Sequence, residues 1–159
     1  MATSTRLSLS EYMKTSYRPD REFVDGELRE RKVGKWEHAR LQALLASWFQ
    51  SQEKSWSVKV ATEQRVQVSP TRVRIPDVML VSRGPQPEVA VDPPVLVVEI
   101  LSPDDTYTET QSRAADYLHM GVPCVWIDPT SRTGANASET HGRRPISWRC
   151  QEQKSRSSC

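Results

Sequence analysis

Two apolar stretches, RIPDVMLV at residues 74–81 and VLVVEILSP at residues 95–103, decide the fold of this chain. Each is a Val, Ile and Leu run bounded by proline, which is typical of a strand buried on both faces in an α/β domain. Each also carries one acid, Asp77 in the first and Glu99 in the second. A buried carboxylate loses its hydration, so it must be paired or bind a metal ion. Asp77 and Glu99 are therefore candidate site residues, unless each only holds a loop through hydrogen bonds.

The length and charge of the chain bear on the number of domains and the kinds of partner. Its 159 residues are typical of one domain with a core of its own. The net charge of +2, from 22 Lys and Arg against 20 Asp and Glu, says little about partners. Basic residues do gather between Arg29 and Arg40 and around the Asp77 stretch. They suit either a phosphate-facing rim or ordinary scattered surface arginines.

The cysteines and the hydropathy indicate a compartment. Cys124, Cys150 and Cys159 are odd in number and lack metal-ligand spacing, which favours a reducing environment over a zinc site. We see no secretion signal and no run of membrane-spanning length. We therefore expect a soluble, cytoplasmic protein.

The N-terminal half predicts a short helix, a hairpin and one long helix. Ser8 and Glu11 have the spacing of a capping box. A hairpin is expected from residues 21–24 and 27–31 around Asp25-Gly26. From Lys35 to about Gln50, apolar residues recur at helical spacing and predict one core-facing stripe: Leu41, Leu44, Leu45, Trp48 and Phe49. Strands are expected at 56–62 and 64–68.

The C-terminal half predicts a strand–helix–strand unit. Thr106 and Glu109 form a second capping box, and the helix should run to about Met120, ended by Gly121 and Pro123. A strand follows at 124–127, so the two strands should be parallel. Residues 1–132 are expected to form the domain. Residues 133–159 have few apolar positions and predict a poorly ordered C-terminal tail.

Several motifs in order resemble one known family. They are EFVDGE at 22–27, His38 early in a helix, IPDV at 75–78, VVEILSP at 97–103, and Tyr117 followed by Gly121-Val-Pro, Trp126-Ile and Asp128-Pro129. Over residues 8–130 they resemble the Uma-type restriction endonuclease family of the PD-(D/E)XK nuclease superfamily. The resemblance implies an α/β fold, restriction-endonuclease-like, with a mixed central sheet flanked by helices. It also implies hydrolysis of phosphodiester bonds in DNA with Mg²⁺ or Mn²⁺.

The resemblance also assigns expected roles. Asp77 and Glu99 match the two acids, and Glu22 or Glu27 stands near an additional N-terminal acid. The superfamily lysine is absent, because Leu101 occupies the simple position and Arg113 the position that the Uma-type family uses, on the helix before Tyr117. Arginine keeps the charge but does not serve as a base. The expected catalytic set is therefore Asp77, Glu99, Arg113 and Glu27.

The expected metal ligands follow from chemistry. Mg²⁺ takes hard oxygen ligands, typically one or two carboxylates plus water and phosphate oxygens. Asp77, Glu99 and the backbone carbonyl of Ile100 could supply them.

Three functions remain open at this stage. The first is a metal-dependent DNA endonuclease, which the pair Asp77 and Glu99 favours. The second is a nuclease fold that binds nucleic acid without turnover, which Arg113 and the atypical tail favour. The third is an α/β protein whose acids are structural. DNA is the expected partner, a membrane is not, and a homodimer is one open alternative.

Overall fold

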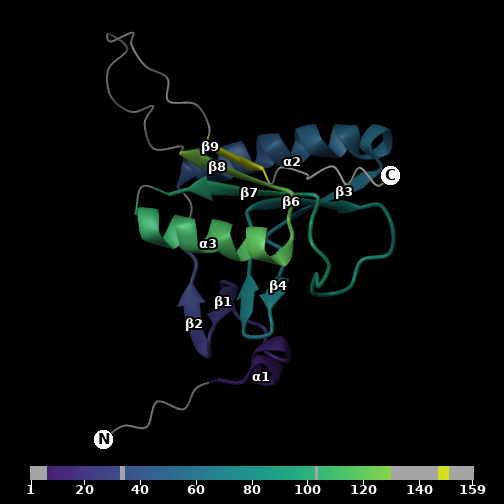
Figure 1. Ribbon diagram of the computed structural model, residues 1–159. Coiled ribbons are helices and arrows are strands. Elements are labelled where there is room, and N and C mark those ends of the chain that lie inside the picture. Colours follow the sequence, from purple (N-terminus) through teal and green to yellow (C-terminus); the bar gives the residue numbers. More distant parts are fainter. Residues whose placement is uncertain (1–6, 33–34, 103, 130–146, 151–159) are drawn as a thin grey trace, which may run out of the picture.

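The structure is a computed structural model that describes residues 7–32, 35–102, 104–129 and 147–150. Its helices are α1 (Leu9–Met13), α2 (Trp36–Trp56) and α3 (Tyr107–Met120). Its strands are β1 (Arg21–Val24), β2 (Glu27–Glu30), β3 (Val58–Thr62), β4 (Val66–Ser69), β5 (Arg72–Arg74), β6 (Val78–Ser82), β7 (Leu96–Leu101), β8 (Cys124–Pro129) and β9 (Ser147–Cys150). They form a four-stranded sheet in the order β2-β1-β5-β4 and a five-stranded sheet in the order β3-β6-β7-β8-β9 (Figure 1).

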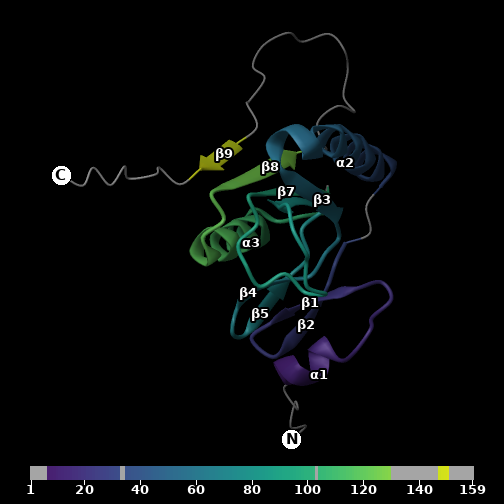
Figure 2. The same cartoon turned by 90° about the vertical axis from the view of Figure 1, so that its right-hand side faces the viewer.

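The five-stranded sheet is the centre of the fold. Strand β7 pairs parallel with β8 and antiparallel with β6, so the sheet is mixed. Helices α2 and α3 lie on opposite faces of it, as the two views together show (Figure 2). This arrangement confirms the predicted α/β fold with a mixed central sheet flanked by helices.

Side chains of β7 alternate between two apolar cores, as a strand buried on both faces requires. Val97 packs in the α3-side cluster with Tyr117, whereas Val98 and Ile100 pack in the α2-side cluster with Phe49. The continuous apolar run therefore marks a central strand, as the sequence predicted.

The predicted strand at 75–81 is shorter than expected. Strand β5 ends at Arg74 in the four-stranded sheet, and β6 begins at Val78 in the five-stranded one. Residues 75–77 form a crossover between the sheets. Pro76 explains the break, because it has no N–H to donate to a ladder.

Helix α2 is longer than predicted, and its apolar stripe is narrower. It continues to Trp56 and ends at Ser57, whose φ of +55° is left-handed. Phe49 is buried and Leu41 and Leu45 pack beside it, but Leu44 and Trp48 are about half exposed. The prediction of one stripe facing the core was wrong for these two residues, because the helix rests on β3, β6 and β7 along a single row of side chains.

Helix α3 begins and ends where the sequence predicted. Thr106 and Glu109 make the reciprocal bonds of a capping box, and Gly121 ends the helix with φ of +103°. The pKa of Glu109 is lowered to about 2, chiefly by its hydrogen bonds to Thr106 and also by Lys32. The helix start is thereby fixed, and with it the direction in which Arg113 and Tyr117 project.

The C-terminal segment is described in part. Residues 147–150 form β9, which pairs antiparallel with β8 and adds an edge strand that the sequence did not predict. The remainder of the expected poorly ordered tail lies outside the described residues. Within the described ranges, no helix combines the length and apolarity needed to cross a bilayer.

A buried charge cluster joins the four-stranded sheet to α3. Arg74 is 4% exposed and bonds to Glu22 and Asp116, each at 2.7 Å. Asp116 also accepts from Arg72 at 2.8 Å. These contacts pair β1 and β5 with α3 through charges that have little access to water.

We predict that Arg74→Ala lowers the free energy of unfolding by about 3–5 kcal/mol, because it leaves buried carboxylates without their cation. Urea denaturation measures the change. The matched control is Arg83→Ala, which removes an exposed arginine and should shift the midpoint little. Equal effects of the two changes would contradict a stabilising role for the cluster.

Candidate active site

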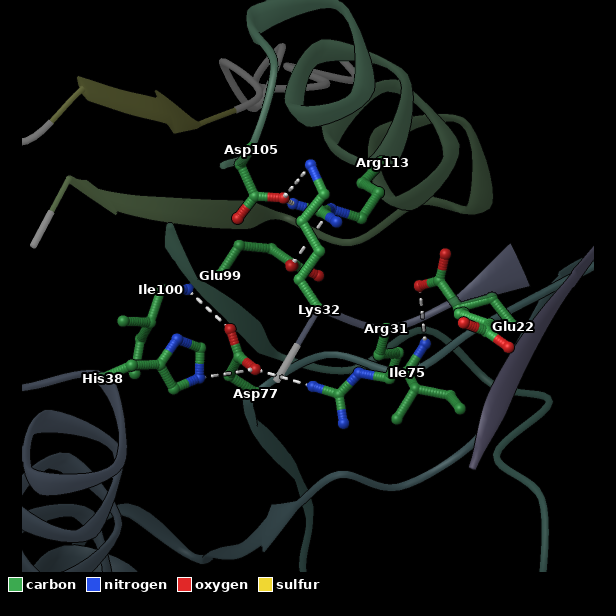
Figure 3. A pocket seen from close by; sticks show the side chains of 11 residues that line it. Glu22, Arg31, Lys32, His38, Ile75, Asp77, Glu99, Ile100, Asp105 and Arg113 are labelled. Carbon is green, nitrogen blue, oxygen red and sulfur yellow. Dashed lines mark hydrogen bonds and ion pairs between the residues drawn. The ribbon is translucent and has the colours of Figure 1, made fainter. Parts of the chain in front are cut away.

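A polar pocket opens where the two sheets, α2 and α3 approach one another (Figure 3). We call it the central pocket. It is lined by Glu22, Glu30, Arg31, Lys32, His38, Ile75, Asp77, Glu99, Ile100, Asp105 and Arg113. Asp77 and Glu99 lie 3% and 5% exposed at its base, so the structure brings the two predicted acids to one place.

Asp77 is held by three donors. Its Oδ2 accepts a hydrogen bond from the backbone N–H of Ile100 at 2.7 Å. Its Oδ1 lies 2.7 Å from Arg31 and 3.3 Å from Nε2 of His38. The backbone bond fixes the crossover against β7, and the Arg31 guanidinium balances the charge of the carboxylate.

His38 lies in the first turn of α2, and its Nε2 meets Asp77. The hydrogen bond to Asp77 raises the pKa of His38, while burial of the ring opposes the shift. Its Nδ1 is buried without a hydrogen-bond partner. His38 thus adds positive charge beside the acid as the pH falls.

Glu99 is the most deeply perturbed acid of the pocket. Its Oε1 accepts a hydrogen bond from the Tyr117 hydroxyl at 2.8 Å, and its Oε2 lies 3.3 Å from Nε of Arg113. The pKa of Glu99 is raised to about 8, chiefly by burial and also by the nearby Asp77 and Glu22, while Arg113 and the Tyr117 hydrogen bond lower it. Desolvation outweighs the ion pair because the whole side chain lies away from water.

Arg113 projects over the acidic strands, as its place on α3 predicted. It bridges Glu99 and Asp105, with its Nη2 3.2 Å from Asp105 Oδ1. Arg113 does not pair with the acids of its own helix in the described structure. Asp116 pairs with Arg72 and Arg74, and Glu109 pairs with Lys32.

The two N-terminal acids take different places. Glu22 lines the pocket, but both its oxygens are engaged, one by Arg74 and one by the N–H of Ile75. Glu27 begins β2, is exposed and lies 3.7 Å from Arg29. The structure does not bring Glu27 to the pocket, because Glu27 pairs with Val24 beside the hairpin turn, further along β1 than Glu22.

Sequence reasoning missed Arg31, Lys32 and Asp105 as pocket residues. The signal for Arg31 and Lys32 was the basic stretch between Arg29 and Arg40, whose phosphate-facing side was one of two interpretations. Asp105 stands just before the capping box, where an acid is ordinary. Only the approach of β2 to α3 makes these residues neighbours.

The donor set suits a hard divalent cation held by few protein ligands. Asp77 and Glu99 offer carboxylate oxygens, the kind that Mg²⁺ accepts together with waters and a phosphate. Among the described residues, no group of three or more His, Cys, Asp or Glu side chains is arranged to hold a metal ion. The pocket thus fits a cation bound through two carboxylates, and not one enclosed by protein ligands.

Comparisons with known proteins agree with this geometry. The Uma2 family model, described as "Putative restriction endonuclease", matches residues 9–136. A crystal structure of a "putative nuclease belonging to DUF820" from Anabaena variabilis ATCC 29413 superposes with a TM-score of 0.68 and 21% identity, covering 76% of this chain and 73% of that one. At this identity the likeness concerns the fold, which is restriction-endonuclease-like. None of the curated proteins compared with the chain matches it.

The raised pKa of Glu99 predicts a pH-dependent stability. The folded state holds this proton up to about pH 8, whereas an unperturbed glutamate releases it near 4.5. The stabilising contribution is therefore complete below pH 4.5 and is lost as the pH rises through about 8. In a chelating buffer, the melting temperature of Glu99→Gln should fall less than that of the wild type between acidic and mildly alkaline pH.

Glu27→Gln is the control for this measurement, because it makes the same change at an exposed position and should follow the wild type. If Glu99→Gln loses as much thermal stability as the wild type over this pH range, Glu99 does not titrate as described.

Proposed function

The chain belongs to the Uma2 restriction endonuclease family, and on this premise we propose that it is a metal-dependent endonuclease that hydrolyses phosphodiester bonds in DNA. The observation that carries the proposal is the meeting of Asp77 and Glu99, from two neighbouring strands, beside the Arg113 guanidinium in one open pocket. Two carboxylates and a fixed cation are the parts that metal-assisted phosphoryl transfer needs.

Asp77 and Glu99 would hold Mg²⁺ or Mn²⁺, with the backbone carbonyl of Ile100 as a further oxygen donor. When bound, the metal ion makes an attached water more acidic and shields the charge of the phosphate. Glu99 binds in its ionised form, so the cation must displace the proton that burial retains on this carboxyl group.

The arginines prepare the site for an anion. Arg113 lies against Glu99, and Arg31 is ion-paired with Asp77. With a metal ion on the two carboxylates, Arg113 would no longer be the main charge partner of Glu99. Its planar fork can then donate two hydrogen bonds to phosphate oxygens and stabilise the charge that develops there. It remains protonated throughout, so it serves as a cation and not as a base.

Two residues position the acids without reaching the substrate. Tyr117 is fully buried and directs Oε1 of Glu99 through its hydroxyl. Glu22 accepts from the N–H of Ile75 and so holds the crossover that presents Asp77. Such fixed geometry reduces the reorganisation that the reaction requires.

The second candidate is a nuclease fold that binds DNA without turnover. One observation favours it: in the described structure the oxygens of Asp77 and Glu99 already accept from or pair with Arg31, His38, Ile100, Tyr117 and Arg113. A permanently paired site would retain the cationic surface and lose the metal ion.

We predict that the wild type nicks supercoiled plasmid in Mg²⁺ or Mn²⁺, and that Asp77→Ala or Glu99→Gln lowers the rate about 100-fold or more, as loss of a metal ligand does. Agarose gels of the open-circular product measure the rate. Glu27→Gln controls for loss of a carboxylate outside the pocket and should cleave like the wild type. DNA binding without nicking by the wild type would support the second candidate instead.

Arg113 gives a separate prediction. Arg113→Ala should lower cleavage about 100-fold, in line with the loss of one charge-stabilising donor. Arg113→Lys restores a compact cation at the family's lysine position and should cleave at least as fast as the wild type. If neither variant differs from the wild type in cleavage or in salt-dependent DNA binding, Arg113 has only a structural role.

A further inference from the structure

A second polar pocket adjoins the central one, and Lys32 lies between them. This side pocket is lined by Glu22, Arg29, Glu30, Lys32, Arg74, Asp105, Glu109, Ser112 and Arg113. Lys32 belongs to both linings, and it is the one lysine that the described part of the chain brings to either pocket. It comes from the segment after β2, whereas Arg113 comes from α3.

Lys32 and Arg113 converge on one carboxylate. The Lys32 ammonium lies 3.7 Å from Oδ1 of Asp105, and Nη2 of Arg113 lies 3.2 Å from the same oxygen. Figure 3 shows the two cationic ends side by side above Glu99, reached from different directions. Two positive groups therefore lie at one edge of the pocket, where a phosphate could replace Asp105 as their shared partner.

The contacts that hold Lys32 leave it free to turn toward a ligand. Its ammonium donates to the backbone carbonyl of Asp104 and to Oε2 of Glu109 at 3.1 Å. The Lys32 side chain is 35% exposed and Glu109 is 46% exposed. Pairs this exposed are weak, and the four-carbon stem of lysine lets the charge move without moving the backbone.

Resting on the proposed function, we propose that Lys32 is a second catalytic cation, which contacts a non-bridging oxygen of the scissile phosphate beside Arg113. The oxygen of a water molecule forms the new bond to phosphorus as the bond to the leaving oxygen breaks; the water gives up a proton to solvent, and the leaving oxygen takes one from solvent. Lys32 keeps its proton and donates a hydrogen bond to the oxygen on which negative charge grows. Arg113 offers a planar fork and Lys32 a compact charge, so the two bind different oxygens of the same group.

The test is plasmid nicking in Mn²⁺ by the full chain. Lys32→Ala should lower kcat about 100-fold with a smaller change in KM, because the contact strengthens as charge develops. Lys54→Ala removes an exposed lysine in the last turn of α2, at the end of the helix away from His38, and should cleave like the wild type. Lys54→Ala should keep the wild-type melting temperature, and Lys32→Ala should lower it little, because the pair of Lys32 with Glu109 is exposed and weak.

A purely structural tie between β2 and α3 is tested by Glu109→Gln. Glutamine keeps the capping box of α3 but removes the charge that pairs with Lys32, so it weakens the tie while the Lys32 ammonium stays at the pocket. Under the proposal, Glu109→Gln cleaves like the wild type.

Three outcomes contradict the inference, and the third of them also contradicts the proposed function. If Lys32→Ala cleaves as fast as the wild type, or Glu109→Gln is as slow as Lys32→Ala, Lys32 does not contact the phosphate and the proposed endonuclease stands. If the wild type itself does not cleave, the proposed function fails and the role of Lys32 fails with it.

Discussion

The carboxylate of Asp77 accepts a hydrogen bond from the backbone N–H of Ile100, 2.7 Å away, and this bond joins the crossover between the two sheets to the central strand β7. Pro76 prevents the crossover from continuing either ladder, so its position is set by such local bonds. The N–H of Ile75 bonds to Glu22 in the same way from the β1 side. A short irregular segment is thereby fixed at both ends, and it presents an acid next to Glu99.

Burial decides the electrostatics of the site. Each buried acid faces an arginine from another element: Glu22 faces Arg74, Asp77 faces Arg31, and Glu99 faces Arg113. Even so, the pKa of Glu99 is raised because desolvation exceeds what its arginine returns. Under the proposed function, a divalent cation or a phosphate would enter a pocket whose acids already have partners, and would bind by exchange with those partners.

An enzyme on this fold would need that exchange of partners at the acids, whereas a binding module would not. Arg113 and Lys32 approach the same oxygen of Asp105 from α3 and from the segment after β2, so the positive charge does not depend on one helix position. Arginine at position 113 keeps a positive charge at the site as a planar fork in place of a compact ammonium.

The sequence by itself determined the central strands, the capped helix α3 and the parallel β7–α3–β8 unit, because apolar periodicity and capping boxes are local signals. It also placed one acid, Asp77 or Glu99, in each of the two apolar stretches. It also identified the family whose model now matches. It could not determine that β5 and β6 lie in different sheets, that Leu44 and Trp48 are exposed, or that Glu22 and not Glu27 reaches the pocket. Nor could it place Arg31, Lys32 and Asp105 at the site. Those features depend on which elements come together, and only the tertiary structure decides contacts between residues as distant along the chain as Lys32 and Glu109.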